Sequence, residues 1–375
     1  MQIGNRTIGP EKEAFIVAEI SGNHHQKYEE AAQLVSAAKD AGADAVKLQT
    51  YTPATITLDV DNDYFRVKGK DQPADWKGER LWDLYEKAHT PWEWQPKLKK
   101  IADQLGIVLF SSPFDDTAVD FLERNVGVAL YKIASYEAVH IPLLRTVAKT
   151  GKPIILSIGF ASGGEVELAV QTLRESGERD IALLHCVTAY SDKPDLSHMN
   201  LATIDDIRER FDVVSGFSDN NAGILVPIIA AVQHRASIIE KHLTLSRERG
   251  GPDARFSLEP QEFSEMVRRL RVGEQKGIEV AIEGIGSMAD VRATKGKAHY
   301  GPASREEQEN MIFRPSLWAV ENIAKGEPFT AKNIRVCRPA YGLAPKYYDI
   351  LLKARAAMDI ERAEPLTTAM IKNTL

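Results

Sequence analysis

The residues best suited to chemistry cluster in the segment 237–260, which reads SIIEKHLTLSRERGGPDARFSLEP. An apolar run at 237–239 leads into Glu240, Lys241 and His242, and a Gly-Gly-Pro-Asp turn follows. This pattern predicts a buried strand whose carboxyl end opens onto a site. His242 at that position is a candidate ligand for a metal such as Mn²⁺ or Zn²⁺. A single histidine also fits a hydrogen-bonded structural role, so the residues around it decide between the two.

Polar side chains also end the other apolar runs of the chain. In chain order they are Glu19, Lys47, Ser111, Ser112, Lys132, Ser135, Ser157, Thr188, Tyr190, Ser218, Asp219, Asn220, Lys241 and His242. A buried lysine is costly unless it is paired or used, and a single one fits a structural ion pair equally well. Two lysines with a ring of hydroxyls predict a pocket for a small, multiply charged anion such as a phosphorylated carboxylate.

Residues on the loops and strand ends near these groups have more than one possible role. Glu19 is a candidate general acid or base, or a holder of metal-bound water, and it is also a candidate counter-ion for Lys47. His24 is a candidate to face the site, whereas His25 is expected in solvent because adjacent loop histidines point apart. Asp253 fits both a substrate ligand and a turn residue whose side chain bonds its own backbone.

These residues need a scaffold, and the pattern of the chain supplies one. Apolar runs at 15–19, 45–49, 107–111, 130–134, 153–157, 181–186, 213–217 and 237–241 alternate with helix-like stretches at 27–41, 92–105, 115–124, 142–149, 163–176, 199–210, 222–234 and 260–276. Eight such units predict an α/β fold in which parallel strands close into a (β/α)₈ TIM barrel. An open doubly wound sheet is the alternative, and the absence of a glycine-rich first turn disfavours it. In a barrel, the residues that end the strands converge on one mouth.

The remaining segments predict the domain organisation. Residues 1–280 form the barrel, with an insertion at 50–91 expected to cover its mouth. Residues 281–312 are rich in Gly, Ala, Ser and charge and predict a linker. Residues 313–375 contain short apolar runs broken by Gly and Pro turns, which predicts a small β-rich domain.

Composition excludes several classes of function. The net charge of −6 argues against a general nucleic-acid or anionic-membrane surface, because both favour excess Lys and Arg. Only Cys186 and Cys337 occur, so no disulfide framework is expected and a reducing compartment is indicated. The start of the chain lacks an apolar signal core, and the longest apolar stretch is too short for a bilayer. We therefore expect a cytoplasmic protein with no membrane or nucleic-acid partner.

Several motifs together resemble the sialic acid (nonulosonic acid) synthase family. They are AEISGNHH, AGADAVKLQTYTP, FSSPFD, YKIAS, GFSD, IEKH, GGPDARFSLEP and FRPSL. The resemblance covers residues 1 to about 350, and SGNHH, KLQTYTP, KGK, LYEKAHTPWEW and ARFSLEP are most similar to the pseudaminic acid synthase branch. It implies a barrel followed by an antifreeze-like (SAF) domain, in agreement with the layout above.

The resemblance also implies a reaction and its residues. The reaction is a divalent-metal-dependent (Mn²⁺ or Mg²⁺) condensation of phosphoenolpyruvate with an open-chain amino sugar aldose, a transferase reaction. By motif, Glu19 and His242 are implied as catalytic, and His242 with Asn220 as metal ligands. Phosphoenolpyruvate is implied to contact Lys47, Ser112, Lys132, Ser135, Ser157 and Ser218, and the sugar to contact Tyr190, Asp253 and Arg314. Arg314 is implied to reach the site of a partner in a domain-swapped homodimer.

Two positions depart from the family pattern. Asn220 stands where the family usually has a second metal-binding histidine, which predicts weaker binding and a preference for a harder ion. Thr188 stands where sialic acid synthases tend to carry Asn, which fits a different sugar. The alternatives are a synthase for N-acetylneuraminate or legionaminate, a Schiff-base aldolase using Lys132, and a sugar-binding homologue without turnover.

Overall fold

Eight parallel strands close into a barrel in the order β10-β3-β4-β5-β6-β7-β8-β9. The structure is a computed structural model that describes residues 1–68, 77–188 and 194–372. The strands are β3 (Phe15–Glu19), β4 (Ala45–Thr50), β5 (Val108–Pro113), β6 (Tyr131–Ile133), β7 (Ile154–Ser157), β8 (Ile181–Val187), β9 (Val214–Asp219) and β10 (Ile238–His242). Each predicted strand has its counterpart, so the barrel prediction is confirmed and the open-sheet alternative is wrong.

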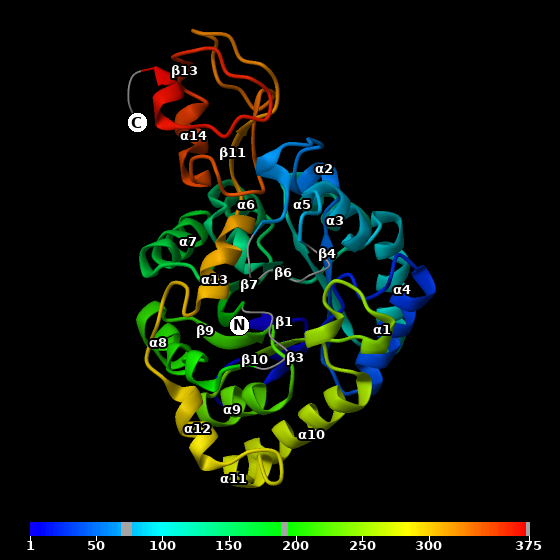
Figure 1. Ribbon diagram of the computed structural model, residues 1–375. Coiled ribbons are helices and arrows are strands. Elements are labelled where there is room, and N and C mark those ends of the chain that lie inside the picture. The colour runs from blue at the N-terminus through cyan, green and yellow to red at the C-terminus, as the bar shows by residue number, and fades with distance from the viewer. Residues whose placement is uncertain (69–76, 189–193, 373–375) are drawn as a thin grey trace.

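A helix follows each barrel strand and lies on the outside of the barrel. Figure 1 looks along the barrel axis and shows these helices as a ring around the strands. They are α1 (Tyr28–Asp40), α4 (Gln95–Leu105), α5 (Asp116–Phe121), α6 (Ile141–Ala148), α7 (Gly163–Glu175), α8 (Ala202–Phe211), α9 (Leu225–His234) and α10 (Pro260–Lys276). Because helices cover the outside and side chains fill the inside, the strands are buried on both faces, which explains their near-continuous apolar sequences.

Local sequence sets where these helices begin and end. Ser162 and Glu165 form a capping box that starts α7, and the Asp115 side chain accepts a hydrogen bond from the Ala118 amide (3.0 Å) to start α5. Gly106 ends α4 with a φ of 65°, a left-handed conformation that glycine adopts without steric cost. These short-range signals are why helix positions are readable from the sequence.

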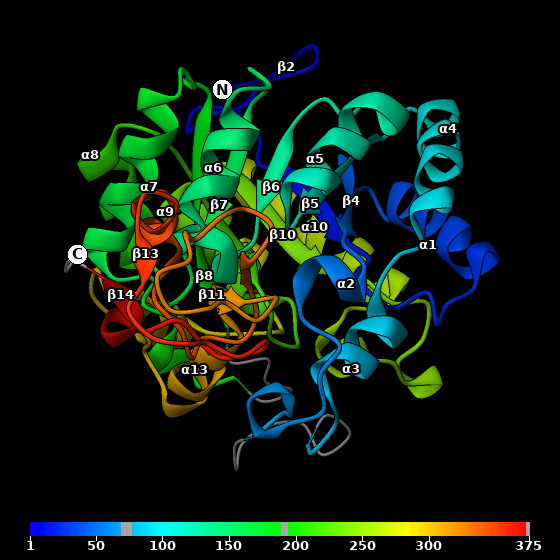
Figure 2. The same ribbon diagram turned by 90° about the horizontal axis from the view of Figure 1, so that it is seen from above.

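The two ends of the barrel are built differently. The hairpin of β1 (Gln2–Ile3) and β2 (Arg6–Thr7) lies at one end. The insertion after β4, with α2 (Pro53–Ile56) and α3 (Leu81–Ala88), lies at the other, as Figure 2 shows. That second end is the mouth towards which the carboxyl ends of the strands point, so the described parts of the insertion lie at the mouth.

The rest of the chain passes along the barrel to a small second domain. The segment predicted as a linker contains α12 (Met288–Lys295) and α13 (Arg305–Asn310), and α11 (Ile278–Ala281) precedes it. The C-terminal domain has strands β11 (Ser316–Ala319), β12 (Ile334–Cys337), β13 (Arg355–Ala356) and β14 (Ile371–Lys372), with helix α14 (Tyr348–Leu351). It has its own apolar core, which includes Leu317, Phe329 and Leu366. It lies beyond α6 in Figure 1 and packs on the barrel of its own chain.

No helix in the described part of the chain is long and apolar enough to cross a membrane.

An ion pair joins β9 and β10 on the outer face of the barrel. Asp219 and Lys241 are partners in the strand register, and Lys241 Nζ lies 2.7 Å from Asp219 Oδ2. Both side chains are buried, with exposed fractions of 1% and 0%. Asn221 also donates two hydrogen bonds to Asp219, from its backbone and side-chain nitrogens (both 3.1 Å). The pair therefore fastens the β9–α9 loop to β10.

We predict that Lys241→Met lowers the free energy of unfolding by about 3–5 kcal/mol, because it leaves the Asp219 carboxylate buried without its cation. The double variant Asp219→Asn/Lys241→Met removes both charges and is expected to recover most of that loss. Denaturant unfolding of the full chain measures both effects. Equal stability of the single and double variants would contradict this account.

Candidate active site

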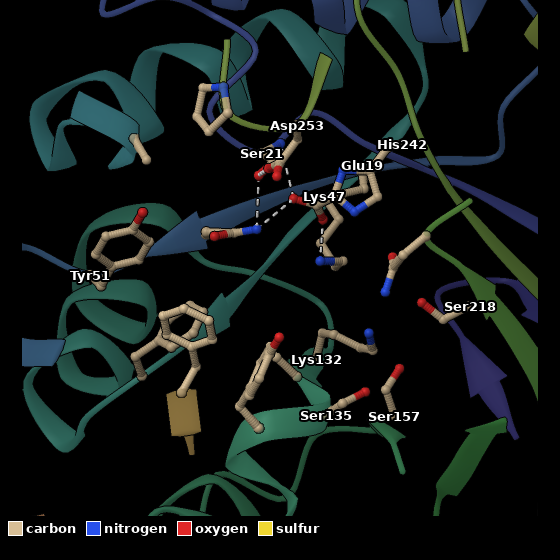
Figure 3. A pocket seen from close by; sticks show the side chains of 18 of the residues that line it. Glu19, Ser21, Lys47, Tyr51, Lys132, Ser135, Ser157, Ser218, His242 and Asp253 are labelled. Carbon is tan, nitrogen blue, oxygen red and sulfur yellow. Dashed lines mark hydrogen bonds and ion pairs between the residues drawn. The ribbon is translucent and has the colours of Figure 1, made fainter. Parts of the chain in front are cut away.

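Most of the predicted site residues meet in one cavity of about 150 Å³ at the barrel mouth. The predicted residues that line it are Glu19, Lys47, Lys132, Ser135, Ser157, Ser218, Asn220, His242 and Asp253. Figure 3 shows Lys132 and the three serines along one side, with Glu19, Lys47 and His242 together above them. The barrel thus brings together side chains from six strands and the loops after them.

Strand register explains why these side chains converge. His242 on β10 pairs with Glu19 on β3, and Glu19 pairs with Lys47 on β4. On the other side, Glu240 of β10 pairs with Ser218 of β9, which pairs in turn with Cys186 of β8. Side chains alternate along a strand, so residues 240 and 242 both point inward. Residue 241 between them points outward, and Lys241 accordingly lies outside the cavity.

The centre of the cavity is a cluster of alternating charges. Lys47 Nζ contacts the Glu19 carboxylate closely and lies 3.8 Å from Glu240 Oε1. Lys132 Nζ lies 2.9 Å from the same Glu240 oxygen, to which Ser218 Oγ also donates a hydrogen bond (3.0 Å). All four charged side chains are at least 95% buried. Glu240 therefore holds the two lysines side by side in the barrel interior.

The cluster sets the protonation of its members. Burial opposes ionisation of Glu240, yet Lys132 and Lys47 outweigh it and lower the pKa of Glu240 to about 2. Burial lowers the pKa of Lys132, with Glu240 acting against it. Burial raises the pKa of Glu19, with Lys47 acting against it. Glu240 is therefore the ionised counter-ion of the lysines. For Glu19 the effect of burial is the larger one, so its net pKa is raised.

The serines supply hydroxyls at the same end of the cavity. Ser157 Oγ is buried without a hydrogen-bond partner among the described residues, and a ligand oxygen would satisfy it. Gly159 has a φ of 41°, and a Cβ there would lie 2.6 Å from the Cβ of Ser135. Glycine at 159 is therefore required for Ser135 to occupy its place. Ser112 does not line the cavity, but its Oγ accepts a hydrogen bond from Lys47 Nζ (3.4 Å) and so positions that lysine.

His242 and Asn220 are the candidate cation ligands. His242 Nδ1 is buried and has no hydrogen-bond partner in the described structure. Burial, with nearby Lys47, lowers the pKa of His242 to about 3, so the imidazole is neutral and able to ligate. Asn220 lines the same cavity and donates from Nδ2 to Cys186 Sγ (3.4 Å). Burial raises the pKa of Cys186 to about 11, so this residue stays a neutral thiol.

No group of three or more His, Cys, Asp or Glu among the described residues could by itself hold a metal ion. The orphaned His242 nitrogen and the Asn220 amide fit a cation that takes its other ligands from water and substrate. Mg²⁺ commonly binds in this way.

A second polar network lines the rim next to Glu19. Ser21 donates from its backbone to Glu19 Oε1 (2.9 Å) and from its hydroxyl to Asp253. Gln49 Nε2 donates to both Glu19 Oε1 and Ser21 Oγ, each at 3.1 Å. Burial raises the pKa of Asp253, with Ser21 acting against it. Asp253 thus lines the cavity next to Ser21, which holds its carboxyl group in place by a hydrogen bond.

Two other predicted residues, His24 and Arg314, do not line the cavity, and a third, Tyr190, is outside the described residues. Arg314 does not line the cavity of its own chain, because it pairs with Glu165 (3.0 Å) and its guanidinium lies over the Phe160 ring (5.1 Å). Its predicted contact with a partner's sugar stays a prediction. His24 is buried against Thr90 (3.1 Å) and does not line the cavity either.

The arginine that does line the cavity is Arg338, which sequence reasoning missed. It comes from the C-terminal domain and pairs with Glu137 of the β6–α6 loop (2.6 Å). Its guanidinium carbon lies 4.7 Å from the centre of the Tyr136 ring. No sequence signal marks Arg338, since only domain packing brings it here. Glu240 was also missed, although it lies two residues before His242 on the same face of a strand, a spacing that could have identified it.

Fold and cavity together define the class of protein: a (β/α)₈ barrel with a site for a small anion beside a candidate cation site. The chain belongs to the NeuB family, which its residues 34–278 match, and residues 314–372 match the SAF domain. The resemblance to sialic acid synthases is therefore confirmed, and so is the prediction of a barrel followed by a SAF domain.

Named relatives match almost the whole chain. A pseudaminic acid synthase from Campylobacter jejuni subsp. jejuni serotype O:23/36 is 38% identical over 98% of each chain. A pseudaminic acid synthase from Helicobacter pylori is 37% identical over 96% of this chain and 98% of its own. Among solved structures, the spore coat polysaccharide biosynthesis protein SpsE from Bacillus subtilis superposes with a TM-score of 0.81 at 30% identity, over 99% of both chains.

We predict that Glu240→Gln makes phosphate binding depend more steeply on pH. Burial lowers the pKa of Lys132, and Glu240 is the main group that opposes this, so without the carboxylate the pKa falls further and Lys132 loses its proton more readily as the pH rises. Calorimetry should show the dissociation constant of inorganic phosphate rising more between pH 6.5 and 9 than in the unmodified protein. The control is Glu123→Gln, which removes the partner of Lys152 (2.5 Å) outside the cavity. Parallel pH profiles for both variants would contradict this role.

Proposed function

We propose that this protein is a pseudaminic acid synthase. It condenses phosphoenolpyruvate with 2,4-diacetamido-2,4,6-trideoxy-L-altrose to give pseudaminic acid and phosphate. The observation that carries the proposal is the sharing of one cavity by Lys47, Lys132, Glu19 and His242. Relatives that bear this name and match nearly the full chain support the choice of sugar.

In this proposal, the lysine and serine end of the cavity binds phosphoenolpyruvate. Lys47 and Lys132 supply positive charge for the phosphate and carboxylate, and the negative charge of Glu240 between them favours the protonated form of both lysines. Ser157 offers a hydroxyl that has no hydrogen-bond partner within the described parts of the chain, and Ser135 and Ser218 lie on the same side. Ser112 acts on the substrate through Lys47.

The reaction forms one C–C bond and one C–O bond and breaks another C–O bond. Carbon 3 of phosphoenolpyruvate attacks the sugar aldehyde, whose oxygen takes up a proton. The oxygen of water then bonds to carbon 2, and one proton of the water replaces the one that the aldehyde oxygen has taken up. As the C–O bond to phosphate breaks, carbon 2 becomes a ketone and the second proton leaves with the phosphate. Glu19 is the group we assign to move the proton, because burial raises its pKa and Lys47 contacts its carboxylate.

The divalent cation of this proposal is Mn²⁺ or Mg²⁺, and when bound it supplies Lewis-acid polarisation of the aldehyde. His242 and Asn220 would hold it. Asp253 and Arg338 are assigned to the sugar, since both line the cavity. Tyr190 and Arg314 keep the sugar-binding roles that the family resemblance implies.

A Schiff-base aldolase is the mechanistic alternative, and the geometry disfavours it. A Schiff-base lysine must lose its proton, whereas Lys132 is ion-paired with Glu240 at 2.9 Å. Borohydride trapping in the presence of substrate would reveal a covalent adduct in that case.

The proposal also includes a cytoplasmic homodimer with exchanged C-terminal domains. Contacts such as Arg338–Glu137 join the C-terminal domain to the barrel, and the same contacts are available between two copies. Light scattering of the purified protein measures its molar mass and so tests whether it is a dimer.

We predict that the purified protein releases phosphate from phosphoenolpyruvate with 2,4-diacetamido-2,4,6-trideoxy-L-altrose and Mn²⁺, and not with N-acetylmannosamine. A coupled phosphate assay measures this. Chelator should abolish the release and added Mn²⁺ or Mg²⁺ should restore it. Turnover of N-acetylmannosamine or the legionaminate precursor alone would make the protein a different nonulosonic acid synthase. Binding of sugar without phosphate release would make it a sugar-binding homologue.

We also predict that His242→Ala weakens Mn²⁺ binding, and that Asn220→His strengthens it about tenfold or more. An imidazole is a better ligand than an amide for this ion, and a tenfold change in affinity corresponds to about 1.4 kcal/mol. Electron paramagnetic resonance of free Mn²⁺ measures the affinity without turnover. The control His185→Asn changes a buried histidine that bonds Met199 O (2.7 Å) away from the cavity. Unchanged affinity in both His242→Ala and Asn220→His would contradict the ligand assignment.

A further inference from the structure

The cavity has two chemically different ends. The charge cluster and the serines form one end, and an apolar wall forms the other. This apolar wall consists of Tyr51, Ile56, Leu84, Tyr85, Phe114 and Phe313. Figure 3 shows Tyr51 on the side of the cavity opposite Ser157 and Ser218. A ligand that fills the cavity must therefore have a charged end and an apolar end.

The apolar wall is mostly a product of the insertion after β4. Tyr51 follows that strand, Ile56 ends α2, and Leu84 and Tyr85 lie on α3. The rings hold one another edge to face, with centroid distances of 5.1 Å for Tyr51–Phe114 and 5.7 Å for Tyr51–Tyr85. Such packing fixes the shape of the wall before a ligand arrives.

Two residues of the wall, Tyr51 and Tyr85, carry hydroxyls, but its aliphatic and phenylalanine side chains offer nothing to a ligand hydroxyl. Ile56, Leu84 and Phe114 have no hydrogen-bonding side-chain atom, and each is at most 8% exposed. The charged side chain next to the wall, Arg338, already donates hydrogen bonds to Glu137 (2.6 Å) and to the Tyr85 hydroxyl (3.2 Å). A ligand hydroxyl against Ile56 and Leu84 would lose water without gaining a partner.

We infer that the apolar wall binds the deoxygenated end of the sugar and makes the enzyme selective for a 6-deoxy sugar over its 6-hydroxy counterpart. This inference rests on the proposed function, which places the aldehyde carbon beside phosphoenolpyruvate at the charged end. Carbon 6 is at the other end of the open-chain sugar, so its methyl group faces Ile56 and Leu84. A methyl group gains from that contact, whereas a hydroxymethyl group there loses hydrogen bonds.

The size of the preference follows from the kind of site. A hydrophobic pocket discriminates against an added hydroxyl by roughly 10–100-fold. We expect kcat/KM for 2,4-diacetamido-2,4,6-trideoxy-L-altrose to exceed that for the 6-hydroxy analogue by such a factor. Replacing an apolar wall residue by a polar one of similar size should shrink the ratio.

The test compares two leucines of one helix. Leu84 lines the cavity, and Leu81, one turn earlier on α3, is buried in the same apolar cluster without lining it. Leu84→Asn should reduce the preference for the 6-deoxy sugar by about tenfold, because the amide gives the hydroxyl a partner. Leu81→Asn should lower stability and leave the preference unchanged. Ile56→Thr is the second variant if Leu84→Asn does not fold, and it should shift the ratio in the same direction.

The outcomes separate this inference from the proposed function. The assay also uses N-acetylmannosamine and its 6-deoxy counterpart, and calorimetric binding ratios replace kcat/KM ratios if no sugar is turned over. If neither altrose sugar is turned over, the proposed function is wrong. The ratio between the 6-deoxy and 6-hydroxy sugars, in the altrose pair or in the mannosamine pair, still tests the apolar wall. Equal kcat/KM or affinity for the 6-deoxy and 6-hydroxy members in the unmodified protein overturns the inference. So does a ratio that Leu84→Asn and Leu81→Asn change equally.

Discussion

The arrangement of Glu19, Lys47, Glu240 and Lys132 inside the barrel constrains everything else at this site. Burying four ionisable groups in a water-poor interior costs much free energy unless each contacts a group of opposite charge. The contacts alternate in sign from Glu19 through Lys47 and Glu240 to Lys132. They come from four different strands, so they exist only when the barrel is closed at the β10–β3 seam. Closure of the fold and assembly of the site are therefore one event.

Side chains alternate between the two faces of β10, so its charged residues act on opposite sides of the barrel wall. Glu240 and His242 point into the cavity. Glu240 pairs with the lysines, and His242 presents a nitrogen that no described residue contacts by a hydrogen bond. Lys241 points outward to Asp219 and ties the neighbouring loop, which carries Asn220, to the strand. The stabilising ion pair thus lies directly behind the reactive residues without adding charge to the cavity.

The cavity combines parts with different origins. The barrel strands provide its charged end, which suits a small anion. The insertion after β4 provides most of the apolar wall, and the C-terminal domain adds Arg338. Because the insertion and the domain are separate from the barrel framework, their side chains can differ while the charged end stays the same.

The sequence alone determined the barrel, because buried strands and capped helices are encoded by short-range patterns such as the runs at 15–19 and 237–241. It also located Lys47, Lys132, Ser157 and His242, since barrel topology sends every strand end to one mouth. The position of Lys241 at a strand end suggested the rim of the cavity, but side chains alternate along a strand and Lys241 lies on the outward face. Only the tertiary structure put Arg338 in the cavity and paired Arg314 with Glu165, because domain packing joins residues far apart in the chain. Contacts of that range depend on how whole surfaces fit together, and no local pattern of residues encodes them.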